Sequence, residues 1–186
     1  MTSTVHYVPI LTTVLSALFA VSLYRRWRIR RAPHLWWWAF GITTYGIGTA
    51  IAHRFASEGA KVVVTDVNAE GALATAAAIR GTGAHARGFA ADIAKAEGCK
   101  SVSADTLAQE GRIDVLCNNA GINRRGPLLS LTAEDWDLSF AVNIDAMFHL
   151  CQAALPSMIA QGGGAIVNTA SQWGLYPAPN HIAYNV

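Results

Sequence analysis

The stretch "AKVVVTD", residues 60–66, decides the fold. It is a short β-branched run that ends in an acid, and this pattern predicts a buried strand. Just before it, residues 49–59 ("TAIAHRFASEG") have apolar side chains at helical spacing and end on Gly59, a common helix terminator. Just after it, the alanine-rich residues 69–83 predict a second helix closed by glycines. A buried strand between two helices is typical of an α/β protein.

The alternation of strand and helix continues along the chain. Further strands are predicted in 85–93, 112–121 and 164–171, and further helices in about 96–110 and 132–162. Thr132 is the expected N-cap of the last helix, because acids follow it in the first turn. Strands separated by helices of this length predict βαβ units and a parallel sheet, which binds ligands at the carboxyl ends of its strands.

The apolar composition is concentrated near the N-terminus. Of the 186 residues 52% are hydrophobic and 14% charged, whereas soluble domains carry about 25% charged residues. Residues 7–24 contain no charge, and residues 25–31 ("RRWRIRR") hold five arginines. A signal peptide has its positive charges before the apolar run, so this order instead predicts a transmembrane helix over about 7–24 with a basic cytoplasmic flank at 25–31. A single-pass membrane protein with a cytoplasmic α/β part is expected, or a cytoplasmic protein if the N-terminal segment is an artefact.

Other classes of function have little support in the sequence. The net charge is +2, and no basic face with interleaved aromatic residues recurs after residue 31, so nucleic-acid binding is not expected. The three cysteines, Cys99, Cys117 and Cys151, show neither a CxxC pattern nor zinc-ligand spacing. They are interpreted as reduced thiols, and no metal site is expected.

A glycine pair and an acid predict a dinucleotide site. Gly46, Ile47 and Gly48 are expected to open a helix, where glycines let the backbone approach a pyrophosphate and the free N–H groups favour its charge. Asp66 closes the next strand about 20 residues later, where a carboxylate can bind the hydroxyls of an adenine ribose. The same carboxylate would repel a 2′-phosphate.

With these features, three further motifs resemble the short-chain dehydrogenase/reductase family. They are "NNAG" at 118–121 after a strand, Asn143 within a long helix, and Ser171 thirteen residues before Tyr184. The resemblance runs from about Gly46 to the last residue. It implies a Rossmann-type doubly wound parallel sheet, a nicotinamide cofactor, interconversion of a carbonyl and an alcohol, and a homo-oligomer for an intact member.

The resemblance also implies a role for each matching residue. Asn143 would hold a water in a proton relay, Ser171 would polarise the substrate carbonyl, and Tyr184 would be the catalytic acid/base. Asp66 matches the ribose-binding acid of the members that prefer NAD. The remaining cofactor-binding matches are Gly46, Ile47 and Gly48 at the phosphates, Asp92 and Ile93 beside the adenine, and Asn119, Ala120 and Gly121 along the cofactor.

The chemistry of these side chains agrees with those roles. Hydride transfer to a carbonyl leaves an alkoxide that needs a proton, which a positioned tyrosine can give. A serine hydroxyl can stabilise the charge that develops on the oxygen.

Two departures from the family pattern affect the expected activity. The family's lysine, which lowers the pKa of the tyrosine, would lie at position 188, whereas the sequence given ends at Val186. The first strand would have to be 35–42 ("LWWWAFGI"), whose consecutive tryptophans are too bulky for a strand covered by helices on both faces, and Gly41 is one residue out of place for the glycine-rich loop.

The sequence therefore predicts an incomplete Rossmann-type sheet in an α/β protein, preceded by an N-terminal transmembrane helix. Residues 1–45 form the membrane-segment region, and residues 46–186 form a truncated dinucleotide-binding domain. The expected function is an NAD-dependent oxidoreductase, impaired or inactive as given, acting on a small-molecule carbonyl or secondary alcohol. The alternative is a small membrane protein with a nucleotide-binding-like α/β remnant and no catalysis.

Overall fold

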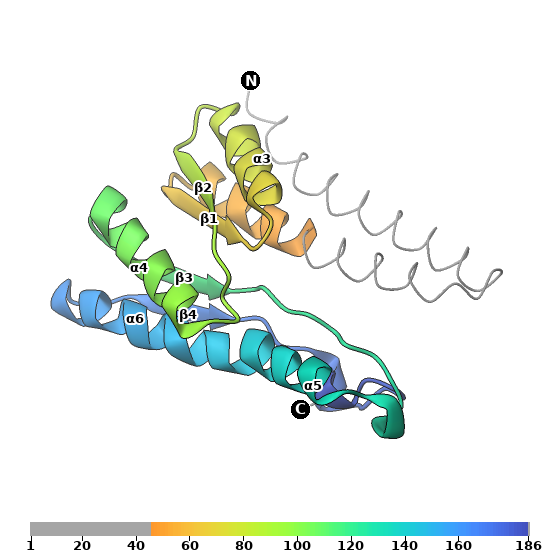
Figure 1. Ribbon diagram of the computed structural model, residues 1–186. Coiled ribbons are helices and arrows are strands. Elements are labelled where there is room, and N and C mark those ends of the chain that lie inside the picture. Colours follow the sequence, from red (N-terminus) through yellow and green to blue (C-terminus); the bar gives the residue numbers. More distant parts are fainter. Residues whose placement is uncertain (1–45, 186) are drawn as a thin grey trace. The chain divides into compact units, whose positions relative to one another are not determined.

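The computed structural model describes residues 46–185 (Figure 1). These residues form two compact units, the first from residues 46–64 and 68–89 and the second from residues 65–67 and 90–185. The predicted transmembrane helix (7–24), its basic flank (25–31) and the first strand expected at 35–42 lie outside the described residues.

The first unit begins with a helix and continues with the predicted strand and helix. Residues 46–57 are helical, and Gly59 follows in the left-handed region with φ +89°, which favours glycine. The next elements are β1 (Val62–Asp66), α3 (Ala69–Arg80) and β2 (Ala86–Ala90). Asn68 caps α3, since its side chain accepts a hydrogen bond from the Glu70 N–H at 3.1 Å. The predicted strand at 60–66 and both flanking helices are confirmed.

Strands β1 and β2 form a two-stranded sheet. Val62 N donates to His85 O at 3.1 Å and Ala91 N donates to Asp66 O at 3.0 Å, so the two strands run in parallel. The buried core of this unit consists mostly of small residues: Ala52, Ala56, Ala76, Ile79 and Ala86.

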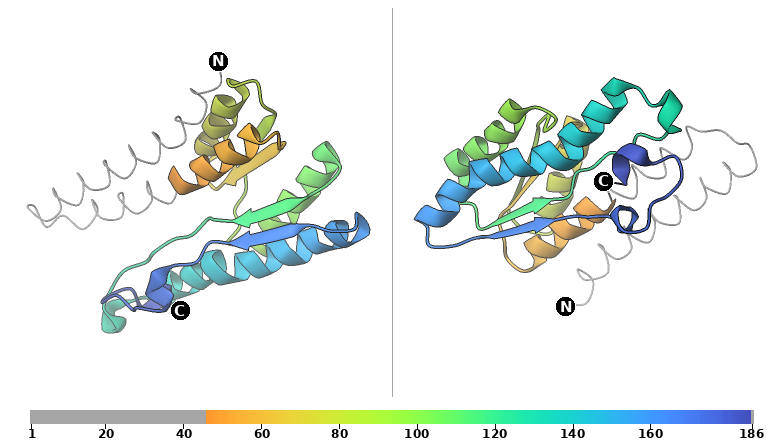
Figure 2. Two further views of the ribbon diagram at one scale, coloured as in Figure 1. Left: turned by 180° about the vertical axis from the view of Figure 1, so that it is seen from behind. Right: turned by 90° about the horizontal axis from the view of Figure 1, so that it is seen from below.

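The second unit is built around a long helix and a second parallel sheet (Figure 2). Its elements are α4 (Ala96–Glu110), β3 (Val115–Asn118), η1 (Leu128–Ser130), α5 (Ala133–Phe140), the π-helical turn η2 (Ala141–Asp145), α6 (Ala146–Ala160), β4 (Ala165–Asn168), η3 (Gln172–Gly174) and η4 (Ile182–Tyr184). The polar helix predicted at 96–110 is confirmed. Thr132 is the N-cap of α5, as predicted, and its hydroxyl accepts a hydrogen bond from Asp135 N at 3.1 Å.

The core of the second unit lies between α4, α6 and the sheet. Cys99 of α4 is fully buried against Ala146 and Leu150 of α6, and Leu116 of β3 packs on them. A neighbouring cluster joins Ile113, Ala154 and Met158 to partly buried Leu107, Leu116 and Ile166. Burial of these side chains fixes the face of β3 that α6 covers.

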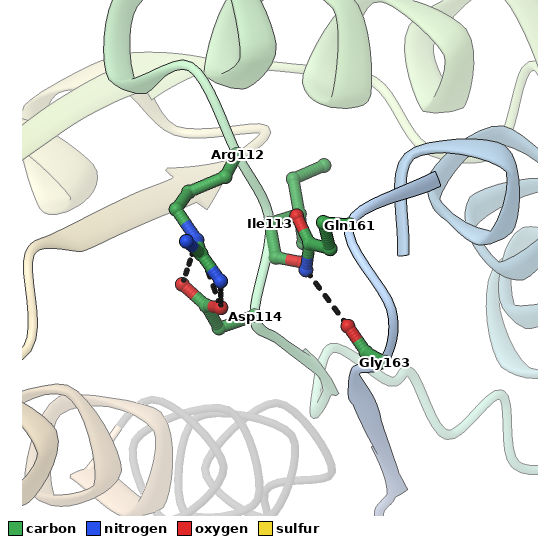
Figure 3. A network of polar contacts seen from close by, with 5 residues as sticks. All are labelled: Arg112, Ile113, Asp114, Gln161 and Gly163. Atoms are coloured by element: carbon green, nitrogen blue, oxygen red, sulfur yellow. Dashed lines mark hydrogen bonds and ion pairs between the residues drawn. The ribbon is translucent and has the colours of Figure 1, made fainter. Parts of the chain in front are cut away.

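Polar contacts at the start of β3 fix its pairing with β4 (Figure 3). The Gln161 side chain donates to Ile113 O at 2.7 Å and to Gly163 O at 2.9 Å, which joins the end of α6 to the approach to β3. The strands then pair in parallel with Val115 opposite Ala165 and Asn118 opposite Asn168. The carboxyl ends of β3 and β4 therefore lie side by side.

The strands of the described chain form two separate two-stranded sheets, β1–β2 and β3–β4. The α/β class is thus confirmed, and no strand within residues 46–185 joins the two pairs.

One described helical stretch, Ala133–Ala160, is long and apolar enough to cross a membrane by length and composition. Core helices that pack inside a domain meet the same criteria, and this stretch contributes Leu150, Ala154 and Met158 to the core described above.

Candidate active site

The site is built at the carboxyl ends of β3 and β4. Thr169 N donates to Asn118 O at 2.9 Å, which continues the pairing one residue past the strands. The Thr169 hydroxyl donates to Asn119 Oδ1 at 3.3 Å, so the predicted cofactor-binding Asn119 is tied to the end of β4. Asn118, which is buried, donates from its amide to Asn168 Oδ1 at 2.8 Å. Side chains thus hold the two segments that leave the sheet close to each other.

Asn143 braces the turn that follows β3. Its amide nitrogen donates to Ile122 O and its amide oxygen accepts from Ile122 N, both at 2.9 Å. A side chain on Gly121 would lie 3.3 Å from Asn143 Oδ1, so a glycine suits this close approach. Asn143 lies in the π-helical turn η2, and π-turns occur often at functional sites because they interrupt the regular helix ladder. The structure therefore brings Asn143 to Gly121 and Ile122, at the end of the predicted cofactor-binding turn 119–121.

Ser171 is the N-cap of η3, just after β4. Its oxygen accepts a hydrogen bond from Trp173 N at 3.2 Å. A serine hydroxyl has one proton and two acceptor lone pairs. Because this contact uses a lone pair, the hydroxyl proton remains suited to donation toward a substrate oxygen.

Trp173 links Ser171 to Tyr184. The Tyr184 ring lies edge-on to the Trp173 ring, with centroids 5.8 Å apart and planes at 81°, an arrangement favoured by the ring quadrupoles. Tyr184 N donates to His181 O at 2.9 Å, which shapes the short helix η4. The two residues predicted to be catalytic are therefore parts of one local cluster, and both are partly exposed.

A buried histidine completes the cluster. His181 is 3% exposed, and its ring lies 4.3 Å from the Trp173 ring, centroid to centroid. Its Nδ1 lies 2.8 Å from Asn123 Nδ2 and 2.9 Å from Asn123 Oδ1. Burial, and next the positive charge of Arg125, lower the pKa of His181 from 6.5 to about 4. His181 is therefore neutral at physiological pH.

The predicted ribose and adenine residues also lie near one another. Asp66 ends β1, is partly exposed, and its carbonyl accepts from Ala91 N, the residue before Asp92. Asp92 accepts from Ala94 N at 3.2 Å and pairs with Lys95 at 2.9 Å, and this hydrogen-bonded pairing lowers its pKa. The buried Cys99 thiol lies 3.2 Å from Ile93 O, which fixes the other adenine-binding candidate.

The predicted phosphate-binding residues belong to the first unit. Gly46, Ile47 and Gly48 are helical, with Gly46 buried and Ile47 exposed. Because residue 45 and those before it lie outside the described residues, the prediction that these three residues open the helix stays a prediction.

Reasoning from the sequence missed three members of the site: Asn123, Trp173 and His181. Each lies within three residues of a predicted site residue or motif, but a single Asn, Trp or His in a loop carries no periodicity or spacing signal. Only the packing of three separate segments reveals that they touch.

An acid ends β1 and another follows β2, a braced turn follows β3, and a serine and a tyrosine follow β4, an arrangement typical of dinucleotide-binding proteins of the Rossmann class. A family model described as short chain dehydrogenase matches residues 43–186. The chain belongs to this family of oxidoreductases, whose members use NAD or NADP.

Individual relatives agree with the family assignment. The chain is 46% identical over 140 residues to "D-threitol dehydrogenase" of Mycolicibacterium smegmatis, covering 75% of this chain and 54% of the relative. It is 38% identical over 141 residues to "Probable galactose dehydrogenase GalD" of Rhizobium meliloti, covering 75% of this chain and 55% of that relative. The chain thus spans about half the length of the curated relatives it matches.

Solved structures give the same result. A metagenomic short-chain oxidoreductase in complex with NADP matches with a TM-score of 0.71 and 37% identity, covering 74% of this chain and 63% of that chain. A gluconate 5-dehydrogenase from Burkholderia cenocepacia J2315, in complex with NADP and tartrate, matches with a TM-score of 0.68 and 34% identity over 75% of this chain and 54% of that one.

Proposed function

We propose that the α/β part of this protein interconverts a small-molecule carbonyl and a secondary alcohol. The observation that carries the proposal is the cluster in which Trp173 contacts both Ser171 and Tyr184, beside the turn braced by Asn143. A bound nicotinamide cofactor would supply or accept the hydride.

The chain's own residues would handle the proton and the developing charge. Ser171 donates a hydrogen bond from its hydroxyl to the substrate oxygen, since the Trp173 N–H engages one lone pair of the Ser171 oxygen and leaves the hydroxyl proton available. Tyr184 gives its phenolic proton to the same oxygen during reduction and takes a proton back during oxidation. Asn143 holds the turn at residues 119–122 in place, and the resemblance adds a water in the proton relay at this residue.

The residues present suit a dinucleotide, and Asp66 favours NAD over NADP. Asp66 ends β1, is partly exposed, and is joined through its backbone carbonyl to Ala91, the residue before Asp92, so a ribose could bind at this end of the strand. A 2′-phosphate brought to the same position would be repelled by its negative charge. Asn119, Ala120 and Gly121 would lie along the cofactor, and Gly46, Ile47 and Gly48 would receive the phosphates.

Titration with both cofactors tests this preference. We expect the unmutated chain to bind NADH at least about tenfold more tightly than NADPH, and Asp66→Ala to reduce that ratio, since one like-charge contact at a partly exposed site is worth on the order of 1 kcal/mol. Glu70→Ala, which removes an exposed acid on α3, is the control and should leave the ratio unchanged. Tighter binding of NADPH by the unmutated chain would refute the preference for NAD.

The substrate class follows from the relatives' names. Relatives named as D-threitol, galactose and sorbitol dehydrogenases act, by those names, on polyols or sugars. We therefore expect polyols and the corresponding ketoses to be turned over before simple hydrophobic ketones. The test measures the change in NADH absorbance with a panel of polyols, ketoses and hydrophobic ketones. No turnover of any of these substrates would refute the proposed reaction.

The alternative of a non-catalytic α/β remnant is not favoured by the family match. Binding of NADH without turnover, by a chain whose α/β part is folded, would support this non-catalytic alternative.

The membrane proposal rests on the sequence alone. We propose that residues 1–45 form a membrane-segment region, with a helix at about 7–24 and the α/β part at 46–186 in the cytoplasm. Extraction with carbonate and protease protection in intact cells would test it, and a chain released by carbonate would contradict it.

We also expect a homo-oligomer, which light scattering would measure.

A further inference from the structure

Two polar side chains without a role in the proposed chemistry are buried beside the site. Asn123 is 2% exposed and His181 is 3% exposed. Both atoms of the Asn123 amide lie within 2.9 Å of His181 Nδ1. Buried polar groups are costly unless they are hydrogen-bonded, so each side chain depends on the other.

A backbone contact joins the same two segments. Gly126 N donates to Asn180 O at 3.0 Å, and Gly126 and His181 form an isolated parallel bridge. The loop after β3 and the segment before Tyr184 are therefore held by one side-chain junction and one backbone junction. Together these fix the register between the two segments.

The His181 side chain also reaches both predicted catalytic residues through one neighbour. Its ring lies against the Trp173 ring, which also contacts Tyr184, and the backbone N–H of Trp173 donates to Ser171 Oγ. The His181 carbonyl in turn accepts the backbone N–H of Tyr184 at 2.9 Å. A displaced His181 would thus move both hydroxyls.

We propose that His181 is a positioning residue which, paired with Asn123, fixes where the hydroxyls of Ser171 and Tyr184 lie. The inference rests on the proposed function for its catalytic consequence. Small displacements of catalytic groups lower rates strongly, because productive geometry is held within fractions of an ångström.

Four substitutions separate positioning from folding. His181→Phe keeps a ring against Trp173 but leaves Asn123 without a hydrogen bond. His181→Gln offers an amide that can pair with Asn123 again. His149→Gln, on α6 outside the cluster and partly buried, is the matched control. Asn123→Ser removes the junction from the other side and replaces His181→Phe if that variant does not fold.

The first measurement needs no catalysis. In the 186-residue chain we expect His181→Phe to speed hydrogen exchange of the amides at 171–185 by about tenfold, as a locally loosened segment would. His181→Gln should restore most of the protection, and His149→Gln should not change it. Unchanged protection in His181→Phe, or in Asn123→Ser where the Phe variant is unfolded, would overturn the inference.

The second measurement is single-turnover oxidation of NADH with the best ketone or ketose of the panel. We expect His181→Phe to lower the rate by about 10- to 100-fold with the NADH Kd changed less than about twofold, and His181→Gln to recover most of the rate. An unchanged rate would overturn the inference. If the unmutated chain binds NADH but never oxidises it, the proposed function fails, and the exchange measurement still decides whether His181 holds the segment.

Discussion

Asn143 uses both ends of its side-chain amide on the backbone of one residue, Ile122. Such a double contact needs a side-chain amide, because neither a carboxylate nor an aliphatic side chain can both donate and accept there. The neighbouring Gly121 leaves the room that this contact needs. At the scale of the residue, therefore, the turn along the expected cofactor is held by a side chain on the long helix.

Removing that amide should destabilise the protein. We expect Asn143→Ala to lower the free energy of unfolding by about 1–3 kcal/mol, since two partly buried backbone groups lose their partner. Urea unfolding measures this, with the exposed Gln152→Ala of α6 as the control. A loss no larger than the control's would mean that water replaces the amide at Ile122.

His181 should make the stability depend on pH. Its pKa is about 4 in the folded chain because of burial and then of Arg125, whereas an unfolded histidine has its ordinary value near 6.5. Between these values the unfolded chain binds a proton that the folded chain does not, so the stability is fully present above about pH 6.5 and falls as the pH drops toward 4. The loss between about pH 7 and about pH 4.5 should be about 2 kcal/mol.

The histidine's own share can be isolated. His181→Gln cannot take up this proton, so its urea midpoint should fall less over the same pH interval than that of the unmutated chain. Parallel falls in the two proteins would assign the pH dependence to other groups.

At the scale of the elements, the sequence predicts strands and helices well because their patterns are local. The polar helix at 96–110 and the N-cap Thr132 are examples in which spacing and capping chemistry alone suffice. The contact of Asn143 with Ile122 could not be predicted, because Ile122 lies 21 residues away in the chain, and no local pattern marks the π-helical turn that carries Asn143. The His181–Asn123 pair spans 58 residues and was missed for the same reason.

A close approach between α4 and the Asp92 turn restricts which residue can stand at position 98. Gly98 lies at the start of α4, and a Cβ there would collide with Asp92 O. We expect Gly98→Ala to cost about 1–3 kcal/mol, because α4 or the Asp92 turn must move to admit one methyl group. Since that turn carries the adenine-binding candidates, NADH affinity should fall as well.

Gly126→Ala is the matched control, because its Cβ would meet Ser130 Oγ at an ordinary 3.7 Å. Thermal unfolding and NADH titration of the two variants measure the difference. Equal behaviour would show that the approach of α4 to Asp92 is not tight in solution.

At the scale of the whole molecule, the family match covers the candidate site, but the family pattern also includes a residue beyond Val186. The match covers residues 43–186, and the predicted catalytic pair and the Asp66 region all fall inside it. The family resemblance also calls for a lysine four residues after Tyr184, at a position beyond the 186 residues of the sequence given. Within residues 46–185 the strands β1–β2 and β3–β4 have no strand joining them.

The polypeptide of residues 1–186 should therefore turn over alcohols and ketones slowly by itself. Loss of a tuned acid/base costs about 10²–10⁴-fold in rate. Unpaired strand edges favour aggregation, so any edge of β1–β2 or β3–β4 that stays unpaired in this polypeptide would lower its activity further.

A second polypeptide tests both causes. It carries a regular first strand and glycine loop before Gly46 and a family-like continuation after Val186 with lysine at position 188. We expect it to oxidise NADH at least about 100-fold faster with the same substrates and to stay monodisperse where the shorter chain aggregates. A third version with glutamine at position 188 keeps the added strands but not the charge, so its rate separates folding from the tuning of the acid/base. Equal rates for residues 1–186 and the extended chain would mean that a residue among these 186 replaces the lysine as the partner of Tyr184. His181, Trp173 and Ser171, which form one cluster with Tyr184, would then be the first candidates.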